Sequence, residues 1–214
     1  MRKLKKILVV IEPKQMRQVA LERAMALAQA AGKDRRKIIA VMPVSEMTPG
    51  IPSVLSVESK EDINADVTAK SEKWLKSYLS IHAMGYDVET RIISSKNVGK
   101  QITQMARDEA VDLLIKPPEV FFTPLDWQLL RHAPVPVLIA KDHIWHPTGI
   151  IAIALDLSDP EDTELKMLNV RLLREAQEVS RIMHCKIHIL NAIPPILPPA
   201  AIDLPGFAPD LLGD

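Results

Sequence analysis

The sequence has little that suits a disulfide-bonded, membrane-bound or nucleic-acid-binding protein. One cysteine occurs among 214 residues, so no intrachain disulfide can form and we expect a reducing, cytoplasmic location. The 27 basic and 27 acidic residues cancel, which predicts no electrostatic attraction to nucleic acid or to an anionic membrane surface. No apolar run approaches the roughly 18 to 20 residues of a membrane helix, so we expect a soluble protein.

Motifs of common enzymes and metal sites are also missing. No Gly-x-Ser-x-Gly nucleophile elbow occurs, and Cys185 lies beside an expected strand rather than at a helix N-terminus, where a thiolate is activated. His184 and His188 would lie about 13 Å apart on one strand, too far to share a metal ion. His143 and His146 have too few further ligands nearby. We therefore expect neither an enzyme nor a metal-binding protein.

What the sequence does contain is an alternation of short apolar runs with longer segments of helical periodicity. This alternation predicts an α/β fold, in which helices cover both faces of a parallel sheet. The predicted strands are residues 6–11, 37–44, 86–94, 111–115 and 135–140. The predicted helices are residues 16–31, 60–84, 98–110 and 124–132. Together they form one complete domain over residues 1–142.

After this domain the opening pattern returns, which indicates an internal repeat. We interpret residues 143–148 as a linker and residues 149–214 as a truncated second domain. The repeated elements are a strand at 149–156, a helix at 168–183 and a strand at 186–192, followed by a proline-rich tail over 193–214. A lone βαβ unit cannot bury both faces of its sheet, so we expect it to pack on the first domain or on a second chain, and we expect a homodimer.

Three segments together resemble the universal stress protein family. They are the start Lys-Lys-Ile-Leu-Val, the fourth strand and the closing Leu-Leu-Arg-His-Ala-Pro-Val-Pro-Val-Leu-Ile at residues 129–139. The segments at residues 122–131 and 202–209 look like the tandem E-type subgroup, which carries two such domains in one chain. The resemblance implies a Rossmann-like five-stranded parallel sheet in the order 3-2-1-4-5 and a role in the stress response.

Many members of this family bind ATP outside the carboxyl ends of the strands. The resemblance implies a site made of an acid after strand one, backbone of strand two and a glycine-rich loop after strand four. Glu12 and Pro43 match the first two positions, and Asp156 and Ala192 match them in the second repeat.

The glycine-rich loop is what this sequence does not reproduce. Strand four runs into Lys-Pro-Pro-Glu-Val-Phe-Phe-Thr at residues 116–123, and no glycine occurs between Gly99 and Gly149. The two prolines lack backbone N–H donors, and Glu119 would repel phosphate. Lys116 could meet a phosphate, but a lone lysine at a strand end is expected to be a solvated charge. The first-domain ATP site is therefore expected to be degenerate.

These observations favour a non-enzymatic protein of the stress response without a cofactor. One alternative is an ATP-binding signalling module that uses Glu12, or Asp156 once a partner completes the site. Another alternative is a binder of an apolar small molecule, at a pocket beside Phe121 and Phe122.

Overall fold

The computed structural model describes residues 4–32, 36–44, 60–119, 121–143 and 149–192. The chain divides into two compact units. Unit 1 comprises Met1–Pro147 with Arg181–His184, and unit 2 comprises Thr148–Ser180 with Cys185–Asp214. Most of the expected linker, and all of the proline-rich tail, lie outside the described residues.

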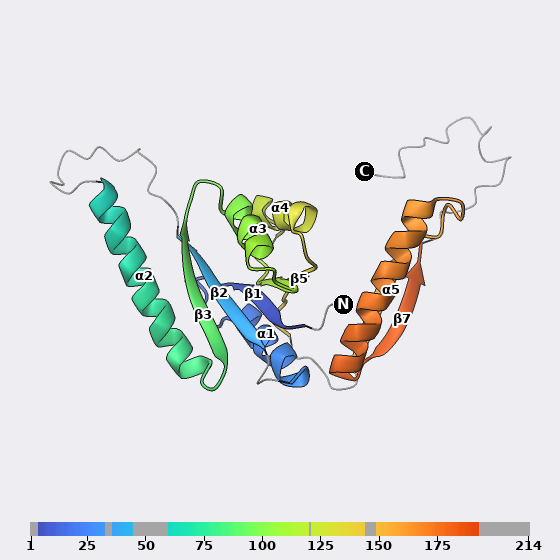
Figure 1. Ribbon diagram of the computed structural model, residues 1–214, viewed down its shortest axis with the longest axis horizontal. Coiled ribbons are helices and arrows are strands. Elements are labelled where there is room, and N and C mark those ends of the chain that lie inside the picture. Colours follow the sequence, from blue (N-terminus) through green and yellow to red (C-terminus); the bar gives the residue numbers. More distant parts are fainter. Residues whose placement is uncertain (1–3, 33–35, 45–59, 120, 144–148, 193–214) are drawn as a thin grey trace, which may run out of the picture. The chain divides into compact units, whose positions relative to one another are not determined.

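Unit 1 is built on a parallel sheet whose strand order is β3-β2-β1-β4-β5 (Figure 1). This order confirms the predicted Rossmann-like fold. The strands are β1 (Lys6–Val10), β2 (Lys37–Val44), β3 (Asp87–Ser94), β4 (Leu113–Lys116) and β5 (Val137–Ile139). The helices are α1 (Val19–Ala30), α2 (Lys60–His82), α3 (Val98–Asp108) and α4 (Pro124–His132).

The central strand β1 explains why its sequence is continuously apolar. Ile7 and Val9 pack into a cluster with α1 and α2, whereas Leu8 and Val10 pack on the opposite face with α3 and α4. Because helices cover both faces, successive side chains of the strand are all buried. The sheet therefore has two apolar layers around β1, whereas the edge strand β3 carries polar side chains along its length, among them Glu89, Thr90 and Arg91.

The first helix starts later than its periodicity predicts. The predicted segment began at residue 16, but α1 begins at Val19. The fully buried Gln18 donates from Nε2 to the carbonyl oxygens of Glu12 and Gln15, both at 2.7 Å. These bonds hold the chain after β1 in turns, so the helix begins only after Gln18.

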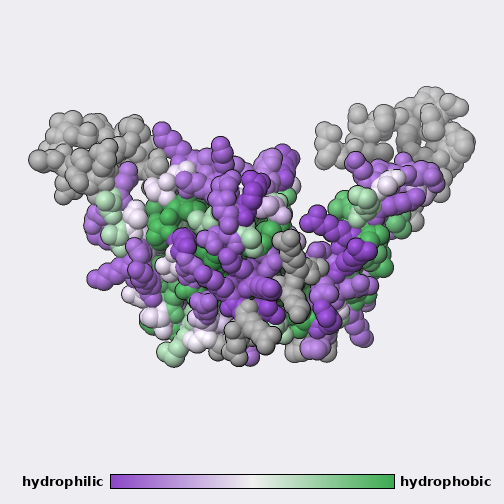
Figure 2. All heavy atoms as spheres, viewed as in Figure 1, coloured by the Kyte–Doolittle hydropathy of each residue, from purple (hydrophilic) through white to green (hydrophobic). Residues whose placement is uncertain are grey.

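Unit 2 contains a single βαβ motif made of β6 (Ile150–Leu155), α5 (Thr163–Met183) and β7 (Lys186–Asn191). Ile153, Leu155 and Ala176 form its small core, and Ile151 and Ile187 are partly buried against it, whereas Ile150, Ile189 and Leu190 are exposed. Apolar residues at the surface of this unit appear as green spheres in Figure 2. His184 has a left-handed φ of 53° and precedes β7. The expectation that His184 and His188 share a strand is therefore wrong.

Among the helices of the described ranges, none is both long enough and apolar enough to cross a membrane.

Candidate functional site

The candidate site of unit 1 lies at the carboxyl ends of β1 and β4. These strands are neighbours in the sheet, with Val9 paired to Ile115. Glu12 follows β1 and Lys116 ends β4. The chain leaves β1 toward β2 on one side, while β4 lies on the other, so this is the point where the strand order reverses. Ligands of open α/β sheets bind at such a switch point.

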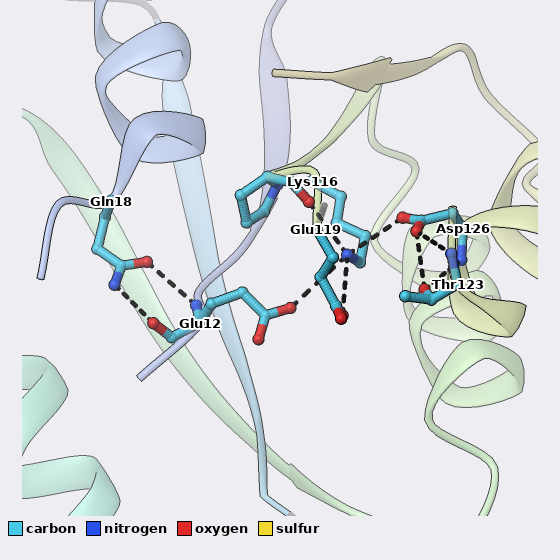
Figure 3. Close-up of polar contacts among 7 residues, drawn as sticks. Glu12, Gln18, Lys116, Glu119, Thr123 and Asp126 are labelled. Atoms are coloured by element: carbon cyan, nitrogen blue, oxygen red, sulfur yellow. Dashed lines mark hydrogen bonds and ion pairs between the residues drawn. The ribbon is translucent and has the colours of Figure 1, made fainter. Parts of the chain in front are cut away.

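Lys116 is fully buried at this point, so the expectation of a solvated charge is wrong. Its ammonium lies 3.1 Å from Asp126 Oδ1, 3.7 Å from Glu12 Oε1 and 4.0 Å from Glu119 Oε1 (Figure 3). It also donates a 3.0 Å hydrogen bond to the carbonyl oxygen of Pro117. We call these four charged residues, Lys116, Glu12, Glu119 and Asp126, the Lys116 cluster.

The alternation of β4 places Lys116 on the same face as Leu114, which packs with α3 and α4. A lysine buried there without partners would cost far more than an apolar residue, because its charge loses hydration. Carboxylates from the end of β1, the loop after β4 and the first turn of α4 surround the ammonium instead. The cluster thus ties three separate segments to the end of β4.

Asp126 is held by a capping box at the start of α4. The backbone N–H and the hydroxyl of Thr123 both donate to Asp126 Oδ2 at 2.7 Å, and the Asp126 N–H donates to Thr123 Oγ1 at 3.3 Å. Burial alone would raise the pKa of this carboxyl. The Thr123 hydrogen bonds and the Lys116 ammonium outweigh burial, and the pKa of Asp126 is lowered. Asp126 is therefore a stable anion at neutral pH.

Glu12 meets the same ammonium in a different electrostatic balance. Burial raises the pKa of Glu12, and the attraction of Lys116 offsets this only in part. Gln18 fixes the backbone here, because the Glu12 N–H donates to Gln18 Oε1 at 3.1 Å. Sequence reasoning identified Glu12 but missed Gln18, which carries no motif. It also missed Asp126, although Thr-x-x-Asp is a recognisable variant of a helix-start signal.

This arrangement leaves few groups to bind a phosphate. Helix N-termini bind anions through free backbone N–H groups. In α4, Pro124 at the first helical position has no N–H, and the Asp126 N–H donates to Thr123. The Lys116 cluster carries one positive and three negative formal charges, a net of −2. Within the described ranges, no group of three or more His, Cys, Asp or Glu residues is arranged to hold a metal ion.

The other predicted nucleotide-binding positions lie on β2 or in unit 2. Pro43 belongs to β2 and pairs with Ile93 of β3. Asp156 follows β6 and is exposed, and the Ser158 N–H donates to its Oδ1 at 2.9 Å. Hydrogen bonds from Ser158 lower the pKa of Asp156. Ala192 is exposed just after β7.

Phe121 and Phe122 lie on the surface of the loop between β4 and α4, with 82% and 53% of their area exposed. Phe122 stacks at a tilt on Trp127, with ring centroids 5.3 Å apart. Both phenylalanines line a cavity of about 80 Å³ together with Glu119 and Lys141. Pockets for drug-sized ligands usually measure about 300 to 1,000 Å³, so this cavity would hold only a very small molecule.

Comparison with known proteins assigns both the fold and its family. The profile of the universal stress protein family matches residues 3–141. The chain is 34% identical to universal stress protein E of Photorhabdus laumondii, with 96% of this chain and 67% of that protein aligned. It is 30% identical to universal stress protein E of Escherichia coli K12, with 97% and 67% aligned.

Among solved structures, a functionally unknown protein of Pseudomonas aeruginosa PAO1 shares the fold. The TM-score is 0.59 at 24% identity, and the match covers 89% of this chain and 61% of that protein. The chain thus spans about two thirds of the length of its curated relatives and less of this structural neighbour.

Proposed function

This chain belongs to the universal stress protein family, and on that premise we propose that it acts in the cellular stress response as a non-enzymatic, cytoplasmic protein whose first-domain ATP site is degenerate. The observation that carries the proposal is the buried Lys116 cluster at the switch point of the sheet. The protein's own lysine and carboxylates interact where a phosphate and its ligands would have to lie.

Besides the space that its own side chains fill, the negative charge of the Lys116 cluster opposes phosphate binding. A nucleotide triphosphate would bring several negative charges to a cluster whose formal charge is already −2. It would also have to separate the Lys116 ammonium from Asp126, which pairs with no other cation in the described part of the chain. Leaving a buried charge unpaired costs several kcal/mol, so binding here is strongly disfavoured.

Asp126 and Lys116 of this cluster support a role without catalysis, whereas Glu12, whose pKa burial raises, does not add to this argument. General acid and base groups work best when their pKa lies near the operating pH. The pKa of Asp126 is instead lowered, so this carboxylate does not exchange protons at neutral pH. The Lys116 ammonium points into three carboxylates and is fully buried, so it is not available to a substrate.

Calorimetric titration of the full 214-residue chain with Mg-ATP tests the proposal. We expect no saturable heat up to millimolar nucleotide, and no rise in melting temperature, because a ligand that binds the native state stabilises it. Saturable heat with a micromolar Kd in the unmodified protein, lost in Glu12→Gln, would show that the first-domain site is functional. A parallel assay of phosphate release should show no ATP hydrolysis.

Asp156 provides the matched control for the second repeat, since it occupies the same position after β6 that Glu12 occupies after β1. Heat that survives Glu12→Gln but disappears in Asp156→Asn would support the ATP-binding alternative for unit 2 alone. The first-domain site would still be degenerate in that case. The apolar-ligand alternative ranks lower, because the cavity beside Phe121 and Phe122 is only about 80 Å³.

A further inference from the structure

The outer edge of β3 is the longest exposed sheet edge of unit 1. In the described part of the sheet β3 pairs with β2 alone, over all eight residues from Asp87 to Ser94 (Figure 1). The opposite edge strand, β5, has only three residues. The backbone N–H and C=O groups along an edge can add a further strand, and the number of such bonds grows with strand length.

A groove follows each face of β3. On the α2 side a groove of about 390 Å³ is lined by Leu79, Ala83, Met84 and Val88 among others. Met84 has 79% of its area exposed there. On the α3 side a groove of about 370 Å³ has a mixed lining of polar and apolar side chains, which includes Arg91, Ile92, Ile93, Gln104, Met105 and Glu109. Because side chains of a strand alternate, a strand added to β3 would insert one set into each groove.

The side chains of β3 determine which strand can pair with its outer edge. On the α2 side it presents Val88, Thr90 and Ile92, and on the α3 side Glu89 and Arg91. We propose that two copies of this chain associate by antiparallel pairing of their β3 strands about a two-fold axis at Thr90. This pairing sets Glu89 opposite Arg91 of the partner subunit twice, and Val88 opposite Ile92 of the partner subunit twice.

Each face of this pairing is chemically matched. Opposite charges and β-branched pairs directly across an antiparallel ladder are stabilising. The two Val88–Ile92 pairs would lie on the α2 side, where Val88 lines the groove beside Met84. The charged pairs would lie on the α3 side, where Arg91 is already 3.6 Å from Glu109 and forms an ion pair with Glu89. The Glu89 carboxylate also meets Lys37 at 2.5 Å.

The charges specify this register and no neighbouring one. A two-fold axis perpendicular to the sheet pairs side chains that lie on the same face of the joined sheet. The axis must therefore pass through a residue of β3, and the alternative registers move it from one residue to the next. Moving the axis from Thr90 to Glu89 sets two glutamates opposite each other, and moving it to Arg91 sets two arginines opposite each other. Like charges directly opposite are destabilising, so the edge favours a second copy in a single alignment.

Charge reversal on full-length protein tests the proposal. Sedimentation over a range of concentrations should show dimers of the unmodified chain. Glu89→Arg and Arg91→Glu should each weaken self-association by about tenfold or more, because symmetry repeats each repulsion twice. An equimolar mixture of the two variants should recover dimers, since the introduced arginine of one chain then faces the introduced glutamate of the other.

Two controls separate this interface from general effects of charge or misfolding. Glu22→Arg and Arg17→Glu reverse the same charges in an exposed ion pair beside α1, outside β3 and both grooves, and should leave association unchanged. Recovery on mixing cannot come from unfolded variants. A chain that is monomeric at all concentrations, or that dimerises equally well with either β3 variant, would overturn the proposal.

Cross-linking tests the register itself. In a Cys185→Ser background, Thr90→Cys should give a disulfide-linked dimer on mild oxidation, since residues opposite each other in a ladder have Cα atoms about 4.5 to 5.5 Å apart. Ser94→Cys is the matched control. Its two copies would lie about 27 Å apart, at roughly 3.4 Å per residue, and should not cross-link. Equal cross-linking of both variants, or none of Thr90→Cys, would contradict the pairing whatever the ATP titration shows.

Discussion

Replacing Lys116 with methionine tests whether the Lys116 cluster stabilises the fold. Lys116→Met keeps a long side chain but removes the cation, leaving Asp126 buried and Glu12 largely buried without their counter-ion. Removing one partner of a buried ion pair typically costs about 3 to 5 kcal/mol. Glu119 adds little to this cost, because its side chain is more than half exposed and 4.0 Å away. We therefore expect a loss of about 3 to 5 kcal/mol in the free energy of unfolding at pH 7.

The loss should depend on pH in a defined direction. In the unmodified protein the pKa of Asp126 is lowered, so its contribution is present above its unfolded pKa near 3.9 and is lost as the pH falls further. In Lys116→Met, Glu12 keeps its burial without the ammonium that offsets it, so its folded pKa rises further above the unfolded value. The pKa of Asp126 also becomes higher than in the unmodified protein, although the Thr123 hydrogen bonds that lower it remain. A carboxyl whose folded pKa lies above its unfolded pKa contributes less to the free energy of unfolding as the pH rises. The difference between the two proteins should therefore shrink between pH 7 and pH 4.5.

Urea unfolding followed by circular dichroism at both pH values measures this difference. Lys70→Met is the matched control, because the Lys70–Asp66 pair lies on an exposed face of α2 and such pairs contribute only about 0.3 to 0.5 kcal/mol. The double variant Lys116→Met with Asp126→Asn should recover part of the loss, since less uncompensated charge stays buried. A Lys116→Met protein within about 1 kcal/mol of the unmodified one, with no change between pH values, would refute the reasoning.

Two further variants of α4 and its cap test the same region. Leu129→Ala, at a fully buried position, should lower the free energy of unfolding by about 2 to 5 kcal/mol. Leu130→Ala, at the adjacent residue with 43% exposure, should lower it by less than about 1 kcal/mol. Equal losses in thermal or urea unfolding would contradict the packing of α4. Thr123→Ala should cost about 1 to 2 kcal/mol through loss of the side-chain cap, and should move acid unfolding to higher pH because Asp126 loses the hydroxyl hydrogen bond that helps to lower its pKa. An unchanged acid transition in that variant would count against the capping box.

The fold could be predicted from the sequence because its signal is local. An uninterrupted apolar run such as residues 7–11 fits only a strand covered on both faces, and Gly85, with a φ of 80°, lies between α2 and β3 where the sequence indicated a helix end. The starts of α2, α3 and α4 fall where the sequence predicts them, whereas α1 begins three residues later than predicted and α5, at Thr163, five residues earlier. The start of α1 depends on Gln18, whose side chain bonds to backbone groups six residues away.

The candidate site could be predicted only in part. The position of Glu12 after β1 follows from the strand pattern, and the missing glycines of the phosphate loop are visible in the sequence. That Lys116 is buried is not visible, because its state depends on Glu12, more than a hundred residues earlier, and on Asp126 in the next helix. Burial of a charge is a property of the assembled partners, and nothing in the local sequence of β4 specifies them.

The charge of the cluster also bears on whether a substitution could create a nucleotide site here. Removing Lys116 leaves three carboxylates and a formal charge of −3, which repels phosphate more strongly than before. Neutralising any one carboxylate instead leaves one positive and two negative charges, a net of −1, with Pro117 and Pro118 still lacking backbone donors. Neutralising one carboxylate therefore leaves the cluster with a negative formal charge, and we expect no such variant to bind ATP at this site.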